Sequence, residues 1–290
     1  MTAAVATSGA TRVARDYYDS EDADGFYRAI WGGEDIHIGL YSSVGDVTDG
    51  APARETIFDA SRRTVERMAS MLSTPDASTR VLDIGSGYGG AARFLARSFG
   101  CHVVALNLSE VENARARALD AEQGLDARID VVHGSFEAIP FPDGSFDAVW
   151  SQDAILHSGD RGKVLAEVAR VLKRGGELVF TDPMQADGCP QGVLQPILDR
   201  IHLESLGSPQ FYREAATRLG LEEVSFVELT PHLVMHYSRV LSETESRREA
   251  LQAEGVSPAY IERMKKGLLH WIEGGKRGHL AWGIFHFRKI

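Results

Sequence analysis

A short apolar segment that ends in a cluster of glycines constrains this chain more than any other stretch. Residues 80–84 are mostly apolar, as expected for a buried strand of a parallel sheet. Segment 85–90 then contains four glycines, and residues 91–99 continue with helical spacing. Glycines allow a tight turn, and free N–H groups at the start of a helix favour a polar or anionic ligand group. The stretch therefore predicts a ligand-binding turn between a strand and a helix.

Two ligand-binding patterns fit these glycines. Gly85, Gly87 and Gly90 match the dinucleotide pattern G-x-G-x-x-G. Gly85, Gly87 and Gly89 match the pattern D/E-x-G-x-G-x-G of methyltransferases that use S-adenosylmethionine (SAM). Asp83 favours the second pattern, because an acid there suits a ligand with an ammonium and a sulfonium better than a pyrophosphate. A glycine turn without a ligand is the weakest alternative, since strand and helix units follow in the right order.

Strands and helices alternate after this turn, which predicts an α/β fold with a doubly wound parallel sheet. In such sheets, ligands bind beyond the carboxyl ends of the strands. Strands are expected at 80–84, 102–107, 129–133, 146–151 and 176–181, and helices at 57–72, 90–99, 109–123 and 161–172.

The pattern changes after Pro183. Residues 184–220 and 233–273 read as mostly helical, residues 221–229 as a strand, and residues 279–288 as a last strand. A long insertion before a final antiparallel strand is typical of methyltransferases. A dehydrogenase would carry a second mononucleotide-binding unit there, so the order of elements disfavours an oxidoreductase.

Composition narrows the class further. The chain has 290 residues and a net charge of −10, which argues against a nucleic-acid partner. Its two cysteines form neither a metal cluster nor a disulfide framework. No apolar run is long enough to span a membrane, and residues 1–10 lack a signal-peptide core. We therefore expect a cytoplasmic location, with no membrane and no metal.

The chain resembles class I SAM-dependent methyltransferases, and most closely the sarcosine/dimethylglycine N-methyltransferases of glycine betaine synthesis. The resemblance covers about residues 16–290. Its motifs are WGGEDIHIGLY, VLDIGSGYGGAARFLAR, NLSEVEN, WSQDAILHS, LKRGGELVFTDPM, QPILDRIHLESLG and HWIEGGKRGHLAWGIFHFRK.

This resemblance implies a Rossmann-like, seven-stranded methyltransferase sheet with helical additions. We expect a disordered tail at 1–15, an N-terminal strap at 16–75, a SAM-binding core at 76–183, and a cap with the last strands at 184–290. It also implies SAM as methyl donor, S-adenosylhomocysteine as product, a small amine such as sarcosine or dimethylglycine as acceptor, and a monomer or weak dimer.

The resemblance and the strand ends together suggest a cofactor site. Asn107 lies at the end of a strand, and its amide oxygen is expected to accept hydrogen bonds from the ribose hydroxyls, with help from Glu112. Ser135 and Phe136 follow a third strand, where the adenine ring is expected. The full set of candidate cofactor residues is Trp31, His37, Asp83, Gly85, Ser86, Gly87, Asn107, Leu108, Glu112, Ser135, Phe136 and Gln152.

The acceptor site is expected around Asp153 and His157, which share one face of a helical turn. In the related amine methyltransferases, the matching Asp holds the ammonium, and the matching His pairs with a strap tyrosine. That tyrosine would be Tyr18, with Tyr17 as the alternative, so Tyr18, Asp153 and His157 are the candidate catalytic residues. Local structural roles are the competing interpretation.

Arg200 is the candidate for holding the acceptor carboxylate, with Arg213, Arg239 and Arg277 as rivals. Trp31 and Tyr18 are expected beside the developing quaternary ammonium. The phosphoethanolamine N-methyltransferases carry Arg where this chain has Gln152, which favours a carboxylate over a phosphate. Another small-molecule methyltransferase or an inactive SAM-binding module stays open as an alternative.

Overall fold

The computed structural model describes residues 9, 20–32, 34–43 and 55–290. Its centre is one sheet with the strand order β3-β2-β1-β4-β5-β9-β7, in which β9 runs antiparallel to both neighbours. The strand order reverses between β1 and β4, where ligands bind in sheets of this kind. The strands are β1 (Arg80–Ile84), β2 (His102–Asn107), β3 (Ile129–His133), β4 (Phe146–Gln152), β5 (Leu172–Thr181), β7 (Leu221–Glu228) and β9 (Gly283–Lys289).

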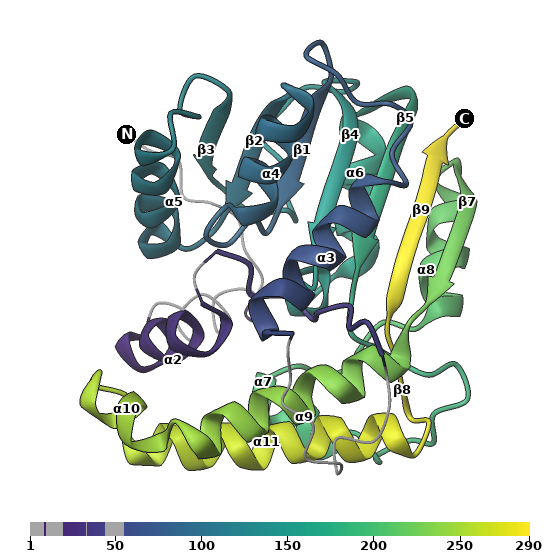
Figure 1. Ribbon diagram of the computed structural model, residues 1–290. Coiled ribbons are helices and arrows are strands. Elements are labelled where there is room, and N and C mark those ends of the chain that lie inside the picture. The colour runs from purple at the N-terminus through teal and green to yellow at the C-terminus, as the bar shows by residue number, and fades with distance from the viewer. Residues whose placement is uncertain (1–8, 10–19, 33, 44–54) are drawn as a thin grey trace.

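Helices cover both faces of the sheet because each carries an apolar stripe (Figure 1). On one face, α3 (Ile57–Ala69) and α4 (Gly90–Phe99) share a core with β1 and β2. On the other face, α6 (Arg161–Val171) and α8 (Pro209–Arg218) pack against β4, β5 and β9. A further helix, α5 (Glu110–Glu122), lies beside β3 and is capped by Ser109.

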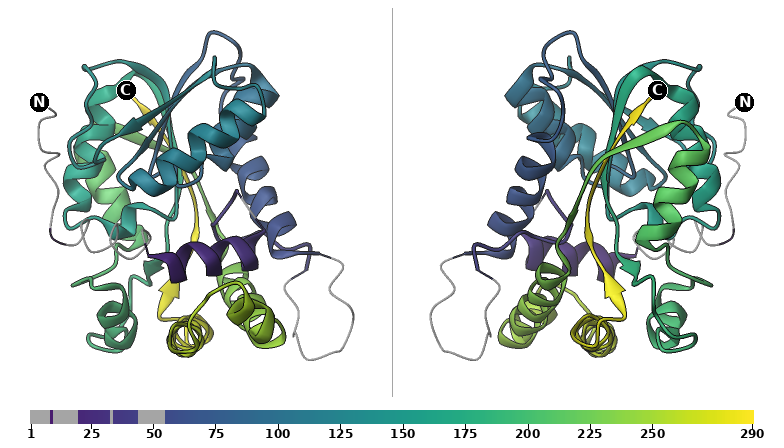
Figure 2. Two further views of the ribbon diagram at one scale, coloured as in Figure 1. Left: turned by 90° about the vertical axis from the view of Figure 1, so that its left-hand side faces the viewer. Right: turned by 90° about the vertical axis from the view of Figure 1, so that its right-hand side faces the viewer.

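A second group of helices lies across the carboxyl ends of the parallel strands, as Figures 1 and 2 show. Helices α9 (Thr230–Ser246) and α11 (Pro258–Lys276) run side by side there, with α10 (Arg248–Ala253) between them in sequence. Helix α2 (Glu21–Trp31) lies between this pair and the sheet. It shares a buried cluster with α9 and α11 that includes Phe26 and Trp31. This arrangement roofs the edge where ligands bind.

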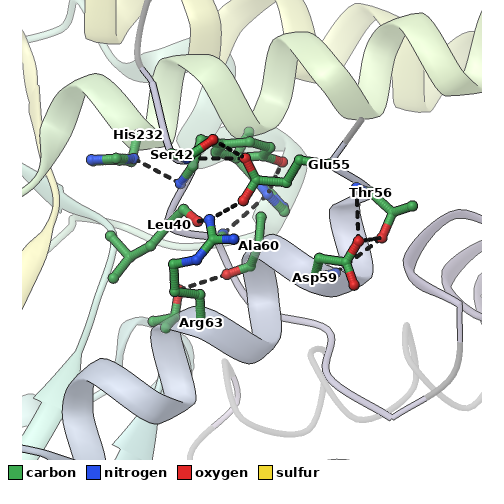
Figure 3. A network of polar contacts seen from close by, with 12 residues as sticks. Leu40, Ser42, Glu55, Thr56, Asp59, Ala60, Arg63 and His232 are labelled. Atoms are coloured by element: carbon green, nitrogen blue, oxygen red, sulfur yellow. Dashed lines mark hydrogen bonds and ion pairs between the residues drawn. The ribbon is translucent and has the colours of Figure 1, made fainter. Parts of the chain in front are cut away.

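Residues 34–43, which we call the strap loop, are held between α3 and α9 (Figure 3). The Leu40 amide donates to the carbonyl of Ala60 at 2.9 Å, and the Tyr41 amide donates to His232 Nδ1 at 3.1 Å. Arg63 donates to the Leu40 carbonyl and pairs with Glu55. The strap loop is therefore fixed by backbone contacts on both sides, which positions its inner residues.

The strands expected at 80–84, 102–107 and 129–133 and the helix at 90–99 are confirmed residue for residue. The expectation of a mostly helical segment 184–220 was wrong. It contains only the short strand β6 (Met184–Gln185), α7 (Gln195–Ile201) and α8, joined by irregular chain.

The last strand is not continuous, in contrast to the expectation for 279–288. It is split into β8 (Leu280–Ala281), which pairs with β6, and β9. Trp282 separates the two because its backbone N–H donates to Thr230 Oγ1 at 3.0 Å instead of to a neighbouring strand. The interruption turns the Trp282 indole toward the ligand edge of the sheet.

None of the helices in the described residues is both long enough and apolar enough to cross a membrane.

Candidate functional site

Two pockets lie at the carboxyl edge of the sheet, under the roof of helices. The first, which we call the glycine pocket, lies at the point where the strand order reverses. It is lined by Ile36, His37, Gly85, Gly87, Asn107, Leu108, Ser109, Glu112, Phe136, Gln152, Asp153, Ala154 and His157. The second, the cap pocket, lies against α7, α9 and α11 and includes Trp31, Arg200, His236 and Trp271.

The two pockets share four lining residues, which are Ile36, His37, Asp153 and His157. Two of these come from the strap loop and two from the segment after β4. Ligands placed in the two pockets would therefore meet at this group. The arrangement suits the transfer of a group from one ligand to the other.

The glycine turn is built for close approach. Gly85, Gly87 and Gly89 all have positive φ values, of 72°, 52° and 79°, which other residues rarely adopt. A Cβ on Gly85 would lie 2.4 Å from the Ala154 Cβ. A Cβ on Gly90 would instead strike the strap loop, 2.2 Å from Asp35 Oδ1. Gly90 therefore serves packing, and the turn itself uses the three glycines of the D/E-x-G-x-G-x-G pattern.

One sequence expectation about this turn needs correction. The N–H groups of Gly85 and Ser86 are not left for a ligand, because both donate to the carbonyl of Leu106, at 2.8 and 3.3 Å. The turn therefore lets a ligand come close to the backbone, but these two N–H groups are not available to bind it.

Asn107 is oriented by a hydrogen bond from its Nδ2 to Glu112 Oε2, at 2.8 Å. This bond assigns the amide so that its oxygen remains the accepting group. The Ser109 hydroxyl caps α5 by accepting from the Glu112 amide at 3.0 Å. Asn107 therefore does not cap α5, and its amide oxygen suits a hydroxyl-bearing ligand.

Asp153 occupies the centre of the shared group in an unusual backbone conformation, with a φ of 50°. Its Oδ2 accepts from the Ile38 amide, and its Oδ1 accepts from Trp282 Nε1, each at 2.9 Å. Burial raises the pKa of this carboxyl, and the two hydrogen bonds oppose that rise. A carboxylate has about four acceptor positions, so Asp153 can hold the strap loop and still accept from a ligand ammonium.

His37 is buried, His157 is half-buried, and both are uncharged near neutral pH. Burial, with the nearby Arg161, lowers the pKa of His157 to about 4. Burial, with Arg62, lowers the pKa of His37 to about 3. A neutral imidazole can accept a proton without first losing one. The site therefore holds two uncharged imidazoles beside the Asp153 side chain.

Arg200 reaches the cap pocket from α7 across a glycine of α11. A Cβ on Gly267 would lie 2.3 Å from Arg200 Nε, so the guanidinium fills space that only glycine leaves open. Its Nη2 lies 2.8 Å from the sulfur of Met264, which is a weak acceptor. Arg200 is the only arginine among the described residues that line this pocket.

The rival arginines lie elsewhere. Arg213 pairs with Glu223 at 2.8 Å on the surface, and Arg277 pairs with Glu273 at 3.6 Å. Arg239 is half-buried on α9, but the cap pocket does not include it. The structure thus brings Arg200, and not its rivals, into the pocket next to Asp153.

Not every expected residue lines a pocket. Asp83, Ser86 and Ser135 are buried behind the glycine pocket, so their part in ligand binding stays a prediction. Trp31 lines the cap pocket and not the glycine pocket. Tyr18 and its alternative Tyr17 lie outside the described residues.

Asp83, two residues before the glycine turn, is a buried acid whose ionised form is disfavoured. Its side chain is 2 % exposed, and its Oδ2 has no hydrogen-bond partner among the described residues. Burial and the nearby Asp35 raise its pKa to about 8. A cationic ligand at the turn would relieve this cost by favouring the ionised carboxylate. Among the described residues, no group of three or more His, Cys, Asp or Glu side chains is placed to hold a metal ion.

Several lining residues were missed from the sequence. Ile36 and Ala154 border the glycine pocket, and Trp282 holds Asp153 through its indole. His236 and Tyr237 of α9 line the cap pocket. The irregular chain between Trp31 and Tyr41 could have indicated the strap residues, but no periodic signal marks Trp282.

Comparison with known proteins identifies relatives of the whole chain. Residues 82–180 match a family model described as a methyltransferase domain. A sarcosine/dimethylglycine N-methyltransferase of Halorhodospira halochloris is 57% identical over 97% of both chains. One of Aphanothece halophytica is 55% identical over 95% of this chain and 96% of the relative.

A solved structure shows the same architecture. It is that of a candidate sarcosine dimethylglycine methyltransferase from Galdieria sulphuraria, with a TM-score of 0.86 and 45% identity. The match covers 94% of this chain and 98% of the other.

Proposed function

The chain belongs to the sarcosine/dimethylglycine N-methyltransferase family, and we propose that it methylates sarcosine to dimethylglycine and dimethylglycine to glycine betaine. The methyl donor is SAM, and the product of the donor is S-adenosylhomocysteine. The observation that carries the proposal is the pairing of a glycine pocket with a cap pocket whose only described arginine is Arg200. The two pockets meet at Asp153 and His157.

The glycine pocket suits the donor. Gly85 and Gly87 line it with positive φ values, and a Cβ on Gly87 would lie 3.8 Å from Ile36 of the same pocket, in space that glycine leaves open. The oriented amide oxygen of Asn107 suits ribose hydroxyls, and Phe136 offers an apolar wall for adenine. When bound, SAM supplies a methyl group on a sulfonium, which an amine can displace without a covalent enzyme intermediate.

The cap pocket suits a short zwitterion. Arg200 matches one carboxylate in charge and in fork geometry, and Asp153 offers an anion for the ammonium. Gln152 is neutral and binds the Trp150 indole through its amide oxygen at 3.0 Å. A phosphate dianion would need more cationic donors than the described residues of this pocket present. The walls include Trp31, Tyr237 and Trp271, whose faces can stabilise a methylated ammonium.

Proton removal and positioning are the tasks of the chain's own residues. The acceptor amine is protonated near neutral pH and must lose that proton before it can attack. Asp153 orients the ammonium, and His157, held neutral by burial, accepts the proton directly or through water. Tyr18 is proposed as the strap partner of His157, as in the related enzymes. Holding nitrogen, methyl carbon and sulfur in line supplies most of the acceleration.

Further features stay part of the proposal. The displacement needs no Lewis acid, because the sulfonium already carries a positive charge and its sulfur leaves as a neutral thioether, so we propose that no metal is required. The division into a strap (16–75), a SAM-binding core (76–183) and a cap (184–290), the monomeric or weakly dimeric state, and the cytoplasmic location stay predictions.

Substitution of Arg200 tests the acceptor assignment. Arg200→Met should raise the KM for dimethylglycine strongly and leave SAM binding almost unchanged, because the guanidinium lies only in the cap pocket. Loss of a desolvated charge pair costs about 2–5 kcal/mol. Arg213→Met, on the surface, is the matched control and should keep the wild-type KM. Steady-state kinetics and calorimetry with S-adenosylhomocysteine measure both. A near-normal KM in Arg200→Met would place the carboxylate elsewhere.

A further inference from the structure

His236 on α9 is a buried histidine that the proposed reaction does not use. Its side chain is fully buried, and it lines the cap pocket together with Arg200. Its ring packs against Trp31, with the centroids 5.4 Å apart, and against Tyr237 at 5.7 Å. It thus stands between the strap loop on one side and the acceptor space on the other.

The hydrogen bonds of His236 fix its tautomer. The Gly39 amide donates to Nδ1 at 3.1 Å, and the Tyr41 hydroxyl lies 3.0 Å from the same nitrogen. A backbone N–H can only donate, so Nδ1 must be the accepting nitrogen. Burial, with the nearby His37, lowers the pKa of His236 to about 3, so the ring is neutral. The single ring proton therefore sits on Nε2.

That Nε2–H group is a donor without an acceptor. Within the described residues, Nε2 is buried and has no hydrogen-bond partner. Buried polar groups are normally paired, and one left unpaired weakens the fold unless a ligand completes it. Gly39 and Tyr41 are bound at the opposite nitrogen of the ring. His236 and Arg200 both line the cap pocket, and they come from two helices that both pack on α11.

We propose that His236 Nε2–H donates a hydrogen bond to the acceptor carboxylate and, with Arg200, makes the cap pocket select short amino acids. The proposal rests on the proposed function. Arg200 supplies the positive charge, and His236 supplies a second, neutral donor that forms a hydrogen bond with a remaining lone pair of the carboxylate. Acceptors without a carboxylate leave this donor unpaired, which disfavours them.

A matched pair of variants separates this role from a purely structural one. An Asn amide reaches the Nδ1 position of histidine, and a Gln amide reaches the Nε2 position. His236→Asn can keep the contact to Gly39 and loses the Nε2 donor, whereas His236→Gln does the reverse. We expect His236→Asn to raise the KM for dimethylglycine about tenfold or more, as loss of a hydrogen bond to a charged group would. Binding of S-adenosylhomocysteine should change little, and His236→Gln should stay closer to the wild-type KM.

The preference for dimethylglycine over N,N-dimethylglycinamide should also shrink in His236→Asn, because the amide lacks the carboxylate. The opposite ranking, with Asn near wild type and Gln impaired, would show that His236 only anchors the strap loop and would overturn the proposal. Turnover of dimethylglycine by the wild-type enzyme is the control for the proposed function. If the wild type turns over dimethylglycine and the variants show the opposite ranking, only the proposal about His236 fails. Wild-type enzyme without that turnover would remove both.

A measurement on the wild-type enzyme covers the case in which the variants fail to fold. With ¹⁵N-labelled histidine and S-adenosylhomocysteine bound, addition of dimethylglycine should move the His236 Nε2–H resonance downfield. N,N-Dimethylglycinamide at the same ionic strength should move it less. An unchanged resonance at saturating dimethylglycine would overturn the proposal.

Discussion

At the scale of single residues, Gly87 is the clearest test of the glycine pocket. It has a φ of 52° and lines the pocket, so a branched side chain would be strained and would fill ligand space. Gly87→Val should weaken binding of SAM and S-adenosylhomocysteine about tenfold or more, as calorimetry measures. Gly144→Val is the matched control, because Gly144 has a φ of 64° with nothing within 4 Å. Full affinity in Gly87→Val would contradict the assignment of this pocket.

Site residues that belong to a short sequence motif could be predicted from the sequence. Site residues that are defined by contacts between distant parts of the chain could not. The spacing of Gly85 and Gly87 and the position of Asn107 after a strand are local signals, and all three line the glycine pocket. Trp282 reaches Asp153 across 129 positions of sequence, and His236 reaches Gly39 across 197. No window of sequence contains such pairs.

At the scale of elements, the strap loop depends on close packing against α3. A Cβ on Gly39 would lie 2.5 Å from the Ala60 Cβ and 2.7 Å from the Ala60 carbonyl carbon. Gly39→Ala should therefore displace the strap loop, destabilise the protein by about 1–3 kcal/mol, and raise the KM for the acceptor. Thermal unfolding and kinetics measure these effects. Gly188→Ala, where nothing lies within 4 Å, is the control and should be neutral. An unaffected Gly39→Ala enzyme would mean that the strap loop is not required for acceptor binding.

The elements of the sheet could be predicted because buried parallel strands and amphipathic helices have strong periodic signals. The segment after Pro183 could not. Helix α7 has seven residues, too few to be stable without tertiary contacts. Apolar residues from α7, the strap loop and Trp271 instead form one buried cluster, which no single periodicity reports. The break at Trp282 also follows from a tertiary contact, with Thr230.

Across the whole molecule, two buried carboxyls lower the stability of the fold as pH rises above their ordinary pKa. Burial raises the pKa of Asp83 to about 8 and that of Asp182 to about 7, from an ordinary value of 3.8. A carboxyl whose folded pKa is raised contributes stability that is lost as pH rises through that pKa. The loss begins above the ordinary pKa of 3.8 and ends once the folded carboxyl has ionised, near pH 7 for Asp182 and near pH 8 for Asp83. Within that window each group lowers stability by up to about 1.4 kcal/mol per pH unit.

The buried histidines act in the other direction but at lower pH. The pKa values of His37, His157 and His236 are lowered from 6.5 to between about 3 and 4, so they destabilise the fold as pH falls below 6.5. The ligand-free enzyme should therefore lose thermal stability from pH 6.5 to 8.5. Asp83→Asn should lose less over that range. If thermal stability fell equally with pH in the wild-type enzyme and in Asp83→Asn, the raised pKa of Asp83 would be contradicted.

The central claim is that the cap pocket selects a short amino acid as the acceptor of the methyl group. Mass spectrometry of the products formed from SAM with sarcosine, dimethylglycine, glycine and phosphoethanolamine tests it most directly. We expect dimethylglycine and glycine betaine as products from the first two acceptors, and negligible methylation of phosphoethanolamine. Methylation of phosphoethanolamine as fast as that of dimethylglycine would contradict the reading of Arg200 and Gln152, and only the methyltransferase class would stand.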